Sequence, residues 1–165
     1  MYGTIFLMGM LCFLMLLGCS TSSKTASDFL EKVKMGQLAG VSIEIGATKQ
    51  EVTEKLGEPI RTGNDEYGFC VYYDGFSLEF EDYAASLAEL NENSKVVLIH
   101  ASPKTVGLTG TPDEIKESLG VPSRELLDDT GDDTFILEYS ESDYLLKLSF
   151  RSKDDPVEYF VLQIK

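Results

Sequence analysis

Few residues of this chain have types and spacings that suggest chemistry. His100 is the one histidine. A serine or cysteine nucleophile needs such a base within hydrogen-bond reach, but nothing in residues 97–102 indicates a catalytic partner. A zinc site requires several cysteine or histidine ligands, and beyond Cys19 only Cys70 and His100 remain. We therefore expect a structural or surface histidine, no cofactor and no enzymatic activity.

Carboxylates gather at one place. Four aspartates surround Gly131, and carboxylate oxygens are the ligands that calcium prefers. Their spacing does not match the calcium loop of an EF-hand. We expect a solvated connection before a strand, with calcium binding as the weaker alternative. The four are Asp128, Asp129, Asp132 and Asp133.

The N-terminus predicts export. Residues 1–18 carry no charged side chain and are almost entirely apolar, which fits a signal-peptide core and is marginal for a membrane span. The run ends in Leu-Leu-Gly-Cys at residues 16–19, which resembles the bacterial lipobox. We expect a lipoprotein signal peptide over 1–18, acyl chains on Cys19 and a flexible tether over 19–26. The protein would then be extracytoplasmic and anchored to the cell membrane, or to an outer membrane if the host has one.

The charge balance limits the partners. The chain has 14 basic and 28 acidic residues, a net charge of −14. This argues against binding nucleic acid or anionic lipid head groups, because like charges repel. It permits a cationic partner or a metal ion. Cys70, in the strand-like run of residues 69–73, has no cysteine partner in the mature chain, so we expect a buried, inert thiol.

Two segments of the chain are similar at a spacing of 63 residues. IGATKQEVTEKLGEPIR at residues 45–61 and LTGTPDEIKESLGVPSR at 108–124 are identical at seven of 17 positions. Each predicts a short helix that opens with a threonine N-cap, with glutamate three residues later to complete a capping box. The glycine followed by proline at the other end predicts where each helix stops. The N-caps are Thr48 and Thr111, and the glycines are Gly57 and Gly120.

Alternating apolar residues after each helix predict strands. We expect them at residues 67–73, 76–81 and 95–101, then at 134–139, 144–150 and 157–164, with an additional helix over 27–35. Glu79, Glu81 and Asp82 would form the polar face and the end of one strand. The predicted class is α+β: a single domain, residues 27–165, of two tandem helix-plus-antiparallel-strand repeats (about 37–102 and 103–165). These would form one sheet with the short helices on one face.

The pattern Gly-x-Thr-x-x-Glu-Val-x-x-x-Leu-Gly-x-Pro at residues 46–59 resembles the helical start of the repeat in β-lactamase-inhibitor-like proteins. The small outer-membrane lipoprotein A family, which assists outer-membrane assembly, shares that unit. The chain is also similar, over residues 28–165, to an uncharacterised lipoprotein family of Gram-positive spore-formers, a domain of unknown function. The resemblance implies the fold more than an activity.

Together these features favour a non-catalytic envelope lipoprotein that binds a protein or peptide. Residues 82–94, much longer than the matching 151–156, would be either a recognition loop or a short helix packed on its own sheet. The alternative function is a module that binds a small ligand or calcium. Aromatic side chains dominate binding hot spots, so the candidate contacts are Tyr72, Tyr73, Phe76 and Tyr83, each of which could equally belong to the core.

Overall fold

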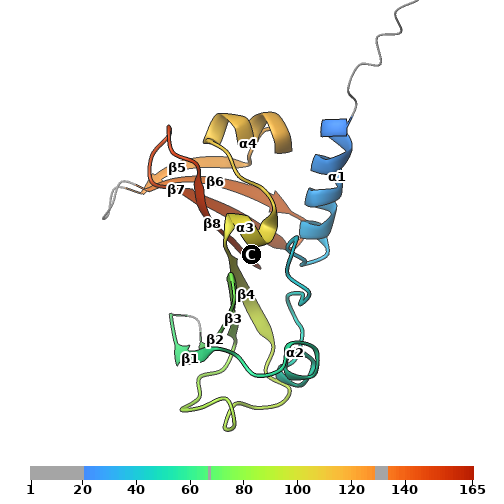
Figure 1. The fold of residues 1–165 in the computed structure, drawn as a ribbon, viewed down its shortest axis with the longest axis vertical. Helices are drawn as coiled ribbons and strands as arrows, with labels where there is room; N and C mark the ends of the chain where they lie inside the picture. Colours follow the sequence, from blue (N-terminus) through green and yellow to red (C-terminus); the bar gives the residue numbers. More distant parts are fainter. Residues whose placement is uncertain (1–20, 67, 129–133) are drawn as a thin grey trace, which may run out of the picture.

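The computed structural model describes residues 21–66, 68–128 and 134–165 as helices, strands and their connections (Figure 1). None of the helices in these ranges is long and apolar enough to cross a membrane. The helices are α1 (Thr21–Lys34), α2 (Lys49–Leu56), α3 (Pro103–Val106) and α4 (Pro112–Leu119). The strands are β1 (Arg61–Asn64), β2 (Phe69–Tyr73), β3 (Phe76–Phe80), β4 (Val96–Ala101), β5 (Arg124–Asp128), β6 (Thr134–Glu141), β7 (Tyr144–Phe150) and β8 (Val157–Ile164).

The strands form one antiparallel sheet in the order β1-β2-β3-β4-β8-β7-β6-β5. Neighbours in space are neighbours in sequence except at the centre, where β4 pairs with β8 and Ile99 lies opposite Leu162. The sheet is strongly twisted, so that β1–β3 and β5–β7 point in different directions in Figure 1. The β4–β8 ladder makes the sheet continuous from one edge to the other.

This topology corrects the predicted fold class. Two tandem helix-plus-strand repeats were expected, and that organisation is wrong, because eight strands form a single continuous sheet. The prediction lacked both edge strands, β1 and β5. They are short and largely exposed, so they show no clean alternation of apolar and polar residues. The six other strands lie close to where they were predicted, and α1 starts at Thr21, earlier than expected and inside the predicted tether.

The caps of α2 and α4 are as predicted. The side chains of Thr48 and Thr111 each accept a hydrogen bond from the backbone N–H of the glutamate three residues on. The carboxylate of that glutamate accepts a hydrogen bond from the backbone N–H of the threonine. Gly57 and Gly120 follow the last helical residues with φ of 71° and 90°. Caps of this kind stabilise a helix by about 1 kcal/mol each, which matters for helices of only eight residues.

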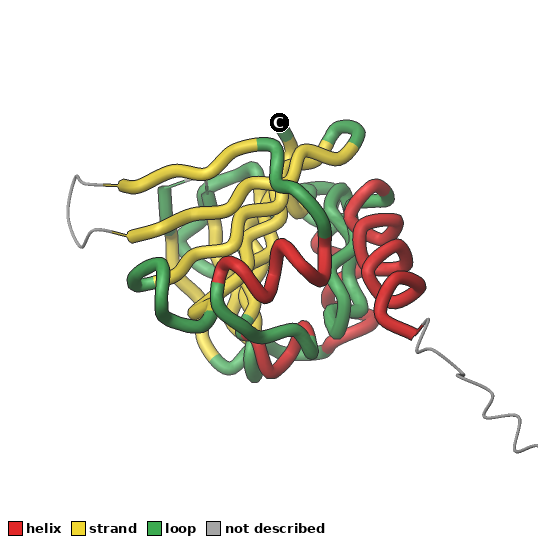
Figure 2. The backbone as a smooth tube through the Cα atoms, turned by 90° about the horizontal axis from the view of Figure 1, so that it is seen from above, coloured by secondary structure: helices red, strands yellow, loops and turns green. Residues whose placement is uncertain are grey.

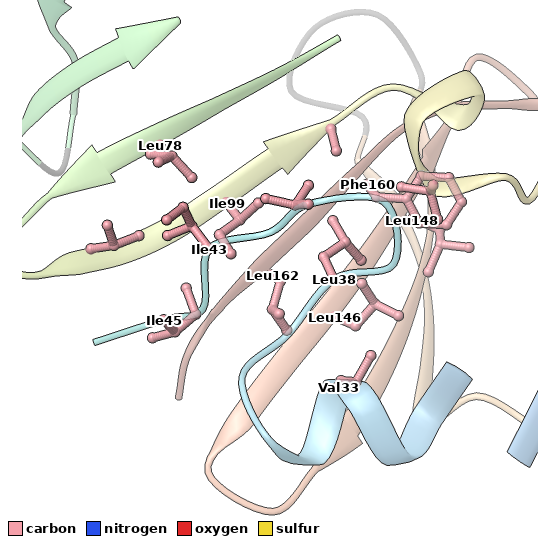
Figure 3. Packing of buried hydrophobic residues seen from close by; sticks show 14 of the residues in the cluster. Val33, Leu38, Ile43, Ile45, Leu78, Ile99, Leu146, Leu148, Phe160 and Leu162 are labelled. Atoms are coloured by element: carbon pink, nitrogen blue, oxygen red, sulfur yellow. The ribbon is translucent and has the colours of Figure 1, made fainter. Parts of the chain in front are cut away.

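One face of the sheet is covered by the hydrophobic core (Figure 3). Val33, Val52 and Ile115 come from three helices and pack with strand residues into one cluster. The connection between α1 and α2 contributes Leu38 and Ile43 to the same cluster. Figure 2 shows the helices gathered along this side of the strands. Strand residues in the cluster include Leu78, Ile99, Leu146, Leu148, Phe160 and Leu162.

Candidate functional site

The opposite face of the sheet is the candidate site, and we call it the open face. Successive side chains of a strand point to opposite faces, so the residues that alternate with the core residues lie here. None of them belongs to the hydrophobic cluster, although Cys70 and Leu98 are as buried as core residues. The open face includes Arg61, Cys70, Tyr72, Ser77, Glu79, Leu98, His100, Arg124, Leu126, Ile136, Glu138, Ser140, Leu145, Lys147, Ser149, Tyr159, Val161 and Gln163, placed by strand register.

One row of side chains crosses all eight strands of the open face. Each member lies directly opposite the next in the register, and an arginine stands at each end. We call it the central row. In order from β1 to β5 it is Arg61, Tyr72, Ser77, His100, Val161, Lys147, Glu138 and Arg124.

Contacts between neighbours hold the two ends of the central row. The guanidinium carbon of Arg61 lies 3.3 Å from the centre of the Tyr72 ring, a cation–π arrangement. At the other end, a guanidinium nitrogen of Arg124 lies 3.6 Å from a carboxylate oxygen of Glu138. Both arginines are exposed, whereas Glu138 is 6 % exposed. The row therefore offers cations at its rims and a less polar middle.

His100 and Tyr159 form the aromatic centre of the open face, with ring centroids 4.8 Å apart. Burial lowers the pKa of His100, so its imidazole is neutral at neutral pH. Val161, next to His100 in the central row, is half-buried, as is Lys147 beyond it. The middle of the face is therefore a mixed surface on which aromatic and aliphatic side chains lie beside the lysine Lys147.

Glu79 and Cys70 lie opposite each other on β3 and β2 and are nearly inaccessible, with 6 % and 1 % exposed. Burial raises the pKa of Cys70, and the nearby Glu79 and Asp65 charges add to the rise while hydrogen bonds with Tyr72 and Ser77 oppose it. The thiol is thus protonated and a poor nucleophile, as predicted for Cys70. Burial also raises the pKa of Glu79 to about 7, with Asp65 and Glu66 contributing.

The four predicted contact aromatics do not share one surface. Tyr72 lies on the open face, in the central row. Tyr73 and Phe76 lie on the other face, stack with centroids 5.2 Å apart and pack against the core. Tyr83 is 64 % exposed in the loop after β3, where its hydroxyl donates to the Glu66 carbonyl across 2.6 Å.

Residues 82–94 pack on the protein itself. Leu90 is 3 % exposed and belongs to the hydrophobic cluster. Lys49 of α2, itself buried, donates from Nζ to the Leu90 carbonyl at 3.0 Å and to the Glu92 carboxylate at 2.8 Å. Of the two interpretations of this segment, packing on its own fold describes it, though as turns and not as a helix.

The other predicted sites are only partly visible. Cys19, Asp129, Asp132 and Asp133 lie outside the described residues, and Asp128 ends β5 with its side chain outside them as well. Among the residues that the structure does describe, no three His, Cys, Asp or Glu side chains are grouped so as to hold a metal ion.

Sequence reasoning missed much of the open face. Arg61 and Arg124 are in strands that were not predicted, and Tyr159 lies on a strand that was. The alternation of Leu145, Lys147 and Ser149 was visible in the sequence, but it showed only that they share a face. Which residues of distant strands join them depends on the register of β4 against β8.

The fold and the open face define a class: a single antiparallel sheet with one face under the core and the other face open. The chain belongs to the family described as "Domain of unknown function (DUF4309)", whose model matches residues 26–162. This confirms the expectation that the chain is a member of a family known as a domain of unknown function.

Two solved structures are similar to this chain. The crystal structure of a DUF4309 family protein, YjgB, from Bacillus subtilis is similar with a TM-score of 0.61 and 18 % identity, covering 87 % of this chain and 99 % of that chain. At that identity it supports the fold alone. An extracellular protein with an SCP domain from Bacillus anthracis matches with a TM-score of 0.45 and 16 % identity, over 73 % of this chain and 44 % of its own. The comparison with curated proteins finds no match.

Proposed function

We propose that this protein is an exported lipoprotein, anchored through acyl chains on Cys19, whose open face binds a protein or peptide without catalysis. The observation that carries the proposal is the central row, a line of side chains across eight strands on the face away from the hydrophobic cluster. Its tyrosine and arginines are the residue types that dominate binding hot spots. A half-buried, register-fixed surface also loses little side-chain entropy when a partner docks.

The composition of the open face supports binding over catalysis. His100 is stacked against Tyr159, and Cys70 is buried and protonated. Neither group has the exposure and activation that a nucleophile or general base requires. A partner would instead meet aromatic, aliphatic and charged side chains in a fixed arrangement.

The proposed lipid anchor at Cys19 is compatible with a binding role for the open face. The family match starts at residue 26, so the apolar N-terminal segment and Cys19 precede the conserved domain. Two acyl chains give stable membrane attachment, which leaves the open face free of any anchoring duty. Incorporation of radiolabelled palmitate tests this part: we expect label in the wild type and none in Cys19→Ser.

A photo-crosslinking amino acid at Val161 tests the binding role, because Val161 lies in the middle of the central row. In intact cells we expect one dominant adduct from this position. The same amino acid at Glu117, which is exposed on α4, is the matched control and should give none. Adding Tyr159→Ala should weaken the adduct, whereas Val121→Ala, which shortens a side chain that is 93 % exposed outside the strands, should leave it unchanged. Equal labelling from Val161 and Glu117 would contradict the proposal.

A further inference from the structure

Glu79 is a buried carboxylate without a counter-charge. It is 6 % exposed, and its Oε2 atom is buried with no hydrogen-bond partner. Its cross-strand neighbours on the open face are Cys70 on β2 and Leu98 on β4, neither of which is a cation. A buried polar atom left unpaired costs about 1–3 kcal/mol, so this arrangement favours a ligand that would pair with it.

The turn between β1 and β2 brings two more carboxylates to the same place. The charges of Asp65 and Glu66 both act on Glu79, and that of Asp65 also acts on Cys70 and Tyr72. Within the described part of the chain, the ion pairs join other residues and none neutralises these three acids. The charges of the exposed Asp65 and Glu66 thus add to that of the buried Glu79 and make the β1–β2 end of the open face negative.

The turn between β1 and β2 is held by hydrogen bonds to Tyr83 and Ala84, which follow β3. The Tyr83 hydroxyl donates to the Glu66 carbonyl at 2.6 Å, and the Asn64 amide donates to the Ala84 carbonyl at 3.0 Å. The Glu66 backbone N–H donates to an Asp65 carboxylate oxygen at 2.9 Å. The segment after β3 thus fixes the two acids beside β2 and β3, so that this negative end of the open face is a formed feature of the surface.

We propose that Glu79, with Asp65 and Glu66, binds a lysine or arginine side chain of the partner. The inference rests on the proposed function, since it names the chemistry that the open face recognises at this end. Because Oε2 is buried, binding requires the Glu79 side chain to turn outward. An organic cation fits better than a metal ion, because the described acids are not grouped as metal ligands.

Cation binding at this site is coupled to a proton. Burial and the two neighbouring acids keep the pKa of Glu79 at about 7, and a bound cation favours the ionised form. Affinity should therefore rise as pH rises from about 6 to about 8. The groups that face Glu79 are Asp65, Glu66 and Cys70, while β4 contributes only Leu98.

The test is an NMR titration of the whole domain with the blocked peptide acetyl-Gly-Arg-Gly-amide, with acetyl-Gly-norleucine-Gly-amide as the uncharged probe. We expect saturable shifts at residues 65–80 with the arginine peptide alone. Glu79→Gln should weaken binding about tenfold, as expected for the loss of one charge-assisted hydrogen bond, and should remove the pH dependence. Glu117→Gln is the control: it removes the same charge from a residue that is exposed on α4, away from the open face.

Each outcome decides between the proposals. The cation site would be overturned if no saturable shift appeared up to about 20 mM peptide, or if Glu79→Gln and wild type bound equally well. In either case the Val161 adduct would still test the wider binding face. Glu79-dependent binding without any Val161 adduct would leave the cation site standing and would contradict the wider binding face. Binding lost equally in both glutamine variants would show a general charge effect and overturn the site.

Discussion

The hydroxyl of Tyr139 on β6 donates a hydrogen bond to the carbonyl oxygen of Gly120, the residue that ends α4, across 3.1 Å. Tyr139 is 2 % exposed, whereas Gly120 lies at the surface, so the bond is partly buried and fixes the end of the helix to the sheet. Tyr73 makes the same type of bond to the Gly57 carbonyl at the end of α2, also at 3.1 Å. In both places a strand tyrosine supplies the partner that a terminal helix carbonyl lacks.

Removing this hydroxyl should destabilise the fold. In Tyr139→Phe the Gly120 carbonyl loses its donor, which should lower the free energy of unfolding by about 1–2 kcal/mol. Urea denaturation monitored by circular dichroism measures the change. Tyr159→Phe, whose ring lies on the open face, is the control and should change stability little. Burial raises the pKa of Tyr139 to about 12, so its hydroxyl should also ionise late in an alkaline titration.

Glu79 should make the protein less stable as pH rises. The pKa of Glu79 is about 7 in the folded protein against an ordinary value of 4.5, so between these pH values the folded state holds a proton that the unfolded chain has released. The contribution of Glu79 to the free energy of unfolding is greatest below about pH 4.5, falls as pH rises to about 7 and stays lower above it. Glu79→Gln should therefore raise the free energy of unfolding at pH 8 by about 2–3 kcal/mol and change it little at pH 4. Equal effects at both pH values would contradict this origin.

Gly40 tests how closely the chain approaches α3. It has a φ of +78°, and a Cβ atom there would lie 1.8 Å from the Thr105 carbonyl oxygen. Gly40→Ala must displace backbone, so we expect a loss of more than about 3 kcal/mol. Gly46→Ala is the matched control, because Gly46 also has a positive φ of +90° but nothing within 4 Å of the added atom. Its cost should be about 1 kcal/mol, and thermal melts would compare the two.

Lys49 should hold residues 82–94 in place. Its ammonium group is buried and joins α2 to Leu90 and Glu92. In Lys49→Ala we expect faster amide hydrogen exchange through this segment and a loss of about 2 kcal/mol, since the Leu90 carbonyl loses its donor. Lys55→Ala, exposed on the same helix, is the control. Unchanged exchange at residues 86–94 in Lys49→Ala would show that the loop packs without this anchor.

Local signals in the sequence were reliable where the structure is local. The capping boxes at Thr48 and Thr111 were predicted because each consists of two residues three positions apart. The strands β6, β7 and β8 were predicted because their apolar residues alternate. β1 and β5 were not, because edge strands of four and five residues need little alternation to be stable.

The open face could not be predicted for a different reason. Alternation showed that Tyr72 and Tyr73 face opposite sides, but not which side carries the core. Glu79 was predicted to lie on a polar strand face, whereas the structure buries it. Its burial comes from neighbours on other elements, and the central row depends on pairing residues 98–101 with 160–163. Such contacts between distant segments leave no periodic trace in either one.

The pairing of β4 with β8 places the last strand in sequence at the middle of the sheet. Strands β5–β8 follow one another through short connections, whereas β3 and β4 are joined by residues 81–95, and the two halves of the sheet meet only when β4 pairs with β8. The sheet therefore closes late, after the longest loop has been ordered, and closure of this kind is slow. Until then, β4 and β8 each present an unpaired edge that invites pairing with another chain. A cell that makes this protein has to keep those two temporary edges apart from their counterparts in neighbouring molecules.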